Sequence, residues 1–198
     1  MFGFIAGIVS AVSSIVTAIK AIVPVLKAVA NVVMNICQTL GLIKPEEKVE
    51  DLGDKAIQAG DEGIKPENYA NYQDYVKAVQ DFQVDPEKSK HITPEEKMAK
   101  ALEVQANLLV EKAPELGVMD YLSLIANHTD YFTPDKTTEL GKLLLSESGA
   151  VTNVAEVLNG TEKNPDKIGA AYETLAKVEK QVDPTISDNE ALKRAMQI

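Results

Sequence analysis

The first 43 residues carry a β-branched apolar residue at every seventh position, and this spacing constrains the fold more than any other feature of the sequence. A seven-residue apolar repeat is typical of helices that pack side by side. A strand would instead alternate apolar and polar residues with a period of two. We therefore predict that residues 1–43, called the N-terminal arm below, are helical. The repeat consists of Ile8, Ile15, Ile22, Val29, Ile36 and Ile43.

A second apolar stripe runs beside the first one, at alternating spacings of three and four residues, so the arm should have a wide apolar face. Pro24 lies on the opposite, mildly polar face and lacks a backbone N–H. The sequence therefore predicts either one helix kinked at Pro24 or two helices near residues 2–22 and 24–42. The second stripe comprises Phe2, Ile5, Val9, Val12, Val16, Ile19, Val23, Leu26, Ala30, Val33, Cys37 and Leu40.

Charge divides the chain into two unlike parts. Lys20 and Lys27 are the only charged residues of the arm. Residues 44–198 hold all thirty acidic residues and eighteen basic ones, which gives them a net charge of −12. We predict an all-α protein with two domains: the apolar helical arm over residues 1–43, and an acidic, soluble, irregular helical bundle over residues 44–198.

Prolines followed by an acidic residue mark the predicted helix starts of the acidic part. Proline fits the first turn of a helix, and an acidic side chain is favourable at the positive end of the helix dipole. Thr93-Pro94-Glu95-Glu96 has the pattern of a complete capping box. Helices are predicted near residues 46–60, 66–82, 94–112, 114–127, 134–147, 150–159, 165–181 and 187–197.

The composition argues against nucleic-acid binding and against catalysis. Phosphate contacts need clustered basic residues, whereas Arg194 is the only arginine of an acidic chain. His91 and His128 belong to no metal-ligand spacing, and each is predicted to lie at the surface. Cys37 is the only cysteine and is predicted to be buried. No motif identifies a catalytic centre, a cofactor or a small-molecule substrate, so we expect a non-enzymatic protein without a cofactor.

Three environments can cover the apolar face of the arm. The first is lipid, because the uncharged residues 1–19 would span about 28 Å as a helix, close to the roughly 30 Å of a bilayer core. The second is other copies of the chain, because Gly3, Gly7 and Ala11 allow helices to approach closely. The third is the core of its own domain. In the first two environments Lys20 and Lys27 mark the boundary of the apolar zone.

Homo-oligomerisation or membrane insertion through the arm is the function that we expect from this pattern. The alternatives are a soluble helical binding module whose arm is its own buried core, and a membrane-permeabilising toxin. The partners expected are other copies of the chain and a lipid membrane, without nucleic acid. The face predicted to make these contacts comprises Phe2, Ile5, Ile8, Val9, Val12, Ile15, Val16, Ile19, Ile22, Val29 and Ile36.

The composition of the arm resembles that of the pilot and ejection proteins of bacteriophages, and that of the paired apolar helices of conjugative pilins. The resemblance covers residues 1–43 only. It implies a structural component of a virion, filament or secretion assembly, located at a membrane or outside the cell. The arm starts without a basic segment and its lysines interrupt the apolar run, so we expect no cleavable signal peptide.

Overall fold

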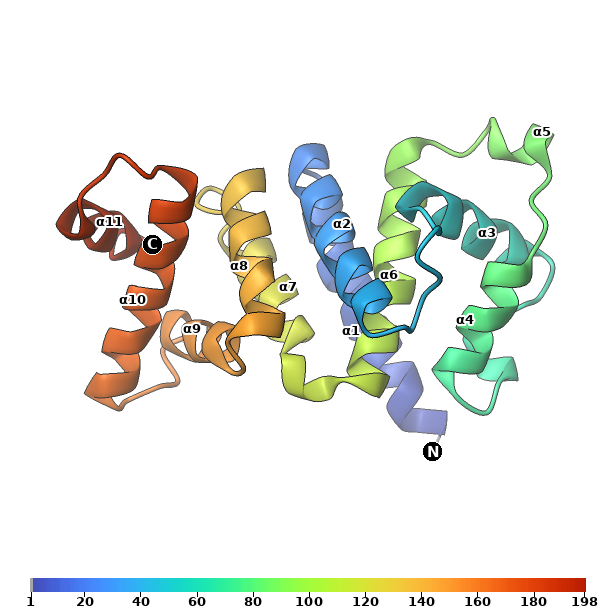
Figure 1. Ribbon diagram of the computed structural model, residues 1–198. Helices are drawn as coiled ribbons and strands as arrows, with labels where there is room; N and C mark the ends of the chain where they lie inside the picture. Colours follow the sequence, from blue (N-terminus) through green and yellow to red (C-terminus); the bar gives the residue numbers. More distant parts are fainter. Residues whose placement is uncertain (1) are drawn as a thin grey trace. The chain divides into compact units, whose positions relative to one another are not determined.

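The computed structural model describes residues 2–198 of the chain and the side chains of residues 9–198. It confirms the predicted all-α fold, because every regular element among residues 2–198 is a helix. The chain divides into two compact units, Met1–Ala113 (unit 1) and Pro114–Ile198 (unit 2). Each unit is described separately below, with the helix labels of Figure 1.

Unit 1 is built around one long helix, α6 (Pro94–Lys112), which the other four long helices of the unit contact. Figure 1 shows α6 in green between the blue α1–α2 pair and α3. Buried residues lie on all sides of α6, as expected for a helix that is surrounded by others. The surrounding helices are α1 (Phe2–Lys20), α2 (Val23–Thr39), α3 (Val49–Asp61) and α4 (Tyr72–Asp81).

The arm consists of two separate helices, one of the two arrangements predicted. The break falls at residues 21–22, and Pro24 lies in the first turn of α2, where its missing N–H breaks no helical hydrogen bond. Both α1 and α2 contact α6, and they also contact each other. The arm therefore lies in one compact unit with residues 44–113.

The second apolar stripe of the arm forms part of the buried core. Most of its members among residues 9–43 are buried, whereas Val9 is half-buried, and Val23 and Leu40, at the two ends of α2, are exposed. Burial of a branched aliphatic side chain contributes about 1.5–3 kcal/mol to folding, so this stripe is a large part of the stability of unit 1. The buried members among residues 9–43 are Val12, Val16, Ile19, Leu26, Ala30, Val33 and Cys37.

Unit 2 is a bundle in which α10 contacts three other helices, α8, α9 and α11. The remaining helix, α7, contacts α8 and α9. Large fully buried side chains of the unit include Tyr121, Phe132 and Leu140. The helices of this unit are α7 (Val118–Asn127), α8 (Pro134–Ser146), α9 (Ala150–Leu158), α10 (Pro165–Val182) and α11 (Asp188–Ala195).

Four predicted helix starts, those of α6, α8, α10 and α11, agree with the structure, and each has a side-chain cap. Thr93 and Glu96 form the capping box of α6, and Thr133, Asn164 and Ser187 cap α8, α10 and α11 with their side chains. These side chains accept hydrogen bonds from backbone N–H groups that would otherwise lack a partner.

Three predicted helices begin later than expected. The first, α3, starts at Val49 instead of near residue 46. Pro66–Asn68 is a single 3-10 turn, and α4 starts only at Tyr72, where the Asn71 side chain provides a cap. Pro114–Leu116 is likewise a 3-10 turn, followed by Gly117 with a φ of 67°. A left-handed glycine cannot continue an α-helix, so α7 begins after it. A short helix that the sequence analysis did not predict, α5 (Pro86–Ser89), lies between α4 and α6.

Candidate functional site

The residues predicted to contact lipid or other copies of the chain are divided by the structure into three groups. Val12, Val16, Ile19, Val29 and Ile36 are buried, whereas Val9, Ile15 and Ile22 are half-buried. The five buried residues form part of the hydrophobic core of unit 1. A role of these residues in contacts to other molecules stays a prediction. The side chains of Phe2, Gly3, Ile5, Gly7 and Ile8 lie outside the described residues.

One predicted close-approach residue, Ala11, and the two predicted boundary lysines are at the surface. Ala11, Lys20 and Lys27 are all exposed. Within the part of the chain that the structure describes, no helix combines the length and the apolar character that crossing a bilayer requires.

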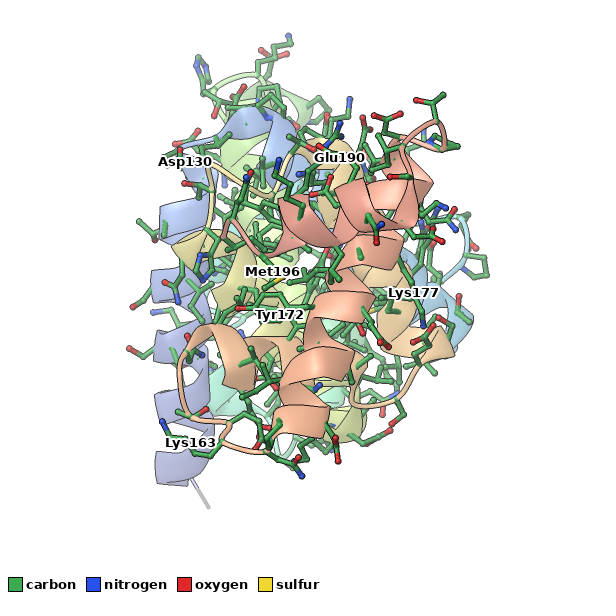
Figure 2. All side chains as sticks on the ribbon, turned by 90° about the vertical axis from the view of Figure 1, so that its left-hand side faces the viewer. Asp130, Lys163, Tyr172, Lys177, Glu190 and Met196 are labelled. Atoms are coloured by element: carbon green, nitrogen blue, oxygen red, sulfur yellow. The ribbon has the colours of Figure 1, made fainter. Side chains whose placement is uncertain are left out.

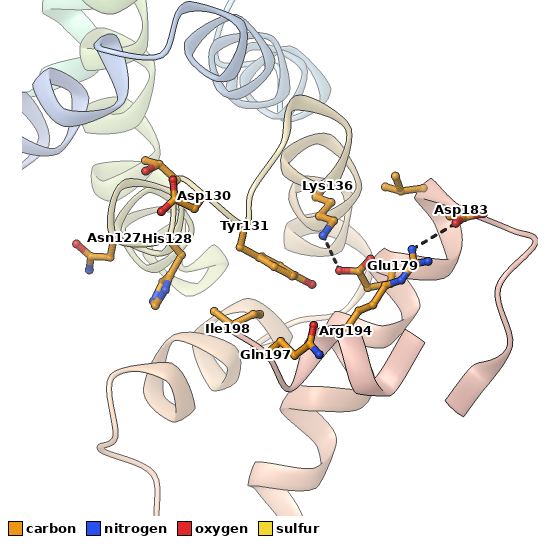
Figure 3. Close-up of a pocket in the computed structure, with 12 residues that line it drawn as sticks. Asn127, His128, Asp130, Tyr131, Lys136, Glu179, Asp183, Arg194, Gln197 and Ile198 are labelled. Atoms are coloured by element: carbon orange, nitrogen blue, oxygen red, sulfur yellow. Dashed lines mark hydrogen bonds and ion pairs between the residues drawn. The ribbon is translucent and has the colours of Figure 1, made fainter. Parts of the chain in front are cut away.

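Unit 2 contains a pocket that the sequence analysis did not predict. Its volume is about 720 Å³. The end of α7 with the following turn, the start of α8, the end of α10 and the end of α11 form its walls (Figure 3). Half-buried and buried polar side chains converge here from α8, α10, α11 and the turn after α7, and the exposed Asn127 is contributed by α7. The lining residues are Asn127, His128, Thr129, Asp130, Tyr131, Lys136, Glu179, Val182, Asp183, Arg194, Gln197 and Ile198.

A buried ion pair lies at one wall of this pocket. The Nζ atom of Lys136 is 2.6 Å from Oε1 of Glu179, and the two side chains are 17% and 2% exposed. The same Nζ atom lies 3.9 Å from the centre of the Tyr131 ring. Lys136 thus combines an ion pair with a cation–π contact, which compensates the cost of removing its charge from water. Figure 3 shows the three side chains together.

The hydroxyl group of Tyr131 is directed toward this ion pair (Figure 3). Its oxygen atom is buried and meets no hydrogen-bond partner at favourable geometry among residues 9–198. Burial, and secondly the neighbouring Glu179 carboxylate, raise the pKa of Tyr131. The hydroxyl group therefore stays protonated at neutral pH and can both donate and accept a hydrogen bond.

Arg194 lies at the α11 wall of the pocket and is shared between two acids. Its Nη1 atom is 3.3 Å from Asp183, and its Nε atom is 3.4 Å from Glu190. A hydrogen bond from the Thr185 hydroxyl, together with the contact to Arg194, lowers the pKa of Asp183. The only arginine of the chain therefore joins α11 to the end of α10, and its side chain remains partly exposed to the pocket.

The opposite wall is the turn that follows α7. His128 and Thr129 are half-buried, whereas Asn127 and Asp130 are exposed. His128, predicted to lie at the surface, thus lies at the edge of a pocket. No sequence signal predicts this arrangement, because the lining residues are scattered over 72 positions from 127 to 198 and share no motif. The one unusual sequence feature among the lining residues is Arg194, the only arginine of the chain.

Two further hollows lie in unit 1. One, of about 400 Å³, lies between α1 and α6, where Lys20 and His91 are among the lining residues. The other, of about 660 Å³, lies between the polar face of α2 and the start of α3, and most of its lining residues are exposed. Among residues 9–198 no group of three or more His, Cys, Asp or Glu side chains is placed to hold a metal ion.

The face of α10 and α11 that Figure 2 shows carries an exposed large apolar side chain, that of Met196. Figure 2 looks onto these two helices and shows Tyr172 and Met196 on this side. Met196 is 60% exposed, more than any other large apolar side chain among the described residues. A single exposed methionine is ordinary for a protein surface, so we assign no site here.

Comparison with known proteins found no match for this chain among protein-family models, curated proteins or solved structures. The function is therefore argued from the residues of the chain itself.

Proposed function

We propose that the protein acts by binding, not by catalysis, and that the pocket of unit 2 is its ligand-binding site. The observation that carries this proposal is a pocket of about 720 Å³ into which polar side chains from four helices converge. Pockets of roughly 300–1,000 Å³ with a few convergent polar groups are typical of sites for small molecules or for a single side chain of a partner.

The charges of the pocket favour binding over chemistry. Lys136 is engaged by Glu179, and Arg194 by Asp183 and Glu190. A general acid or base needs a pKa near the working pH and direct access to the reacting atom. Tyr131 stays protonated because its pKa is raised, and two of the three lining acids, Glu179 and Asp183, are held in ion pairs. Such a set of side chains orients a ligand and does not transfer its protons.

In this proposal the arm has a structural role. The side chains of Val12, Val16, Ile19 and Leu26 are nearly inaccessible to solvent in a single chain. This supports the expectation of a soluble helical binding module whose arm is its own core, one of the alternatives that the sequence left open.

The proposal is tested by screening a library of small polar compounds against ¹⁵N-labelled protein by NMR. Saturable shifts at the amides of His128, Tyr131 and Gln197 are expected for the compounds that bind. Asn127→Trp, which places a large side chain at the exposed edge of the pocket, should weaken these shifts. The control is Asn189→Trp, at an exposed position of α11 that does not line the pocket. Absence of any saturable shift at these amides would refute the proposal.

Self-association through the arm is the second candidate function, and one observation favours it. Ala11, Ser14 and Ala18 are all exposed, and their spacing places them on one face of α1. Small residues at this spacing allow another helix to approach closely. The contact face would then be the small residues of α1, while the isoleucine and valine side chains stay in the core.

This second candidate is tested by light scattering coupled to size-exclusion chromatography. The wild-type chain should elute as an oligomer, and Ala18→Leu should dissociate it, because a larger side chain separates the helices. Thr39→Leu, at an exposed position of α2, is the control and should leave the oligomer intact. A wild-type protein that stays monomeric up to millimolar concentration excludes this candidate.

A further inference from the structure

The negative ends of three helices meet at the pocket of unit 2. Asn127 is the last residue of α7, Val182 is the last residue of α10, and Gln197 lies two residues after the end of α11. The C-terminal end of a helix acts as about half a negative charge. The only helix that begins at the pocket is α8, with Lys136 in its first turn. The backbone therefore makes the electrostatic potential of the pocket more negative.

The side chains that line the pocket add to this potential. Three carboxylates, those of Asp130, Glu179 and Asp183, face two cationic groups, those of Lys136 and Arg194. Both cationic groups are already engaged in ion pairs. With histidine counted as neutral, the lining therefore carries a net charge of −1 before the helix ends are considered. A ligand with positive charge complements both contributions.

One ammonium group of the protein itself, that of Lys136, is held at a wall of this pocket by an aromatic face and a carboxylate. The Nζ atom of Lys136 lies over the face of the Tyr131 ring and against the Glu179 carboxylate. Tyr131 also presents a buried oxygen atom that can accept a hydrogen bond, as can the side-chain oxygen atoms of Gln197 and Asn127. Aromatic faces and carbonyl or hydroxyl oxygens are the groups that bind alkylammonium ions in proteins.

We propose that the pocket of unit 2 binds a ligand through a primary alkylammonium group, either of a small diamine or of a lysine side chain. This proposal rests on the binding function proposed above and names its ligand class. The volume of about 720 Å³ exceeds that of an ammonium group many times, so the alkyl chain enters the pocket with it. Asp130, exposed at the edge of the pocket, is the carboxylate that meets the ammonium group first.

The test compares three compounds of equal chain length and different charge by NMR titration of the full-length protein. They are 1,5-diaminopentane, glutarate and 1,5-pentanediol. Saturable shifts at the amides of His128, Tyr131 and Gln197 are expected with the diamine alone, and the affinity should fall as salt is added. A fourth titration, with Nα-acetyl-lysine amide, distinguishes the two sources of the ammonium group. Binding that is tighter for the lysine amide than for the diamine indicates a peptide ligand.

A pair of matched variants tests the contribution of Asp130. Asp130→Asn should weaken binding of the diamine by about three- to fivefold, the effect of one exposed charge pair. Asp130 is exposed and makes no ion pair among those observed, so this variant should keep its fold. Asp135→Asn is the control, because Asp135 is also exposed but does not line the pocket. It should leave the affinity unchanged.

The possible outcomes separate this inference from the proposed function. Saturable binding of glutarate or pentanediol without binding of the diamine overturns the inference and leaves a binding pocket. Failure of all four compounds, while other compounds of the library bind, also overturns the inference alone. If no compound of any kind shifts the pocket amides, both the inference and the proposed function are wrong.

Discussion

Gly53 of α3 lies directly against the backbone of Lys97 in α6. A Cβ atom at position 53 would be 1.8 Å from the Lys97 carbonyl oxygen and 2.8 Å from its Cα atom. No side-chain movement can relieve an overlap with backbone atoms. Gly53→Ala should therefore force the two helices apart, at a cost of about 3 kcal/mol or more in the free energy of unfolding. Urea unfolding followed by circular dichroism measures this loss.

A second glycine of α3 provides the matched control. A Cβ atom at Gly60 would meet no atom within 4 Å. Gly60→Ala should stabilise the protein by about 0.5–1 kcal/mol, because alanine loses less entropy than glycine when the helix forms. If both variants unfold at the same urea concentration, the backbone of α3 does not approach that of α6 as closely at Gly53 as the structure shows.

The carboxylate of Asp54 is the centre of a buried polar network in unit 1. The Nζ atom of Lys97 is 2.7 Å away, the amide of Gln58 donates a hydrogen bond of 2.8 Å, and the hydroxyl of Ser89 donates another. Burial raises the pKa of Asp54, but the three donors together outweigh it and lower the pKa below its ordinary value. The network therefore stabilises the folded state only while Asp54 is ionised.

The pH dependence follows from the direction of this shift. Because the pKa is lower in the folded state, the contribution of Asp54 is fully present above its unfolded pKa of about 3.9 and is lost as pH falls through the folded pKa. Asp54→Asn leaves Lys97 without its ionic partner and should cost about 3 kcal/mol at pH 7. The difference between variant and wild type should shrink below pH 4 in urea unfolding measured across pH. A difference that stays constant down to pH 2 would contradict this account.

The capping box of α6 gives a third prediction. The Thr93 hydroxyl accepts a hydrogen bond from the Glu96 backbone N–H, and the Glu96 carboxylate accepts one from the Thr93 N–H. Thr93→Ala should lower the free energy of unfolding by about 1 kcal/mol, because an N–H of the first turn loses its partner. Thr93→Ser keeps the hydroxyl and should retain most of the stability. Equal unfolding midpoints for the two variants would show that the cap contributes nothing.

The helix starts of this fold could be predicted from the sequence because their causes are local. A cap such as Thr93 with Glu96, or a proline in a first turn such as Pro24, acts within four residues of the chain. The helix starts at Tyr72 and Val118 were missed because a second cap at Asn71 and the left-handed Gly117 compete with the proline before them. Both signals are also local, but each is a weaker predictor of a helix start than a proline followed by an acidic residue.

The packing of the arm and the pocket could not be predicted in the same way. The heptad spacing of Val12, Val16 and Ile19 shows that a helix face is covered, but the same spacing suits lipid, another chain or the helix α6 of the same chain. The pocket depends on contacts such as that of Lys136 with Glu179, 43 positions apart. Only the folded chain brings these residues together, since no periodicity links them.

The role of the arm is tested most directly by alanine substitutions of two aliphatic residues of α2, one buried and one exposed. Leu26 is completely buried, whereas Val23 is 39% exposed. If the arm is part of the core of unit 1, Leu26→Ala should lower the free energy of unfolding by about 2–5 kcal/mol, and Val23→Ala by well under 1 kcal/mol. The measurement is urea unfolding at a protein concentration at which the chain is monomeric. Nearly equal, small losses for both variants would contradict the account, because they would mean that the isoleucine and valine stripe is not packed within its own chain.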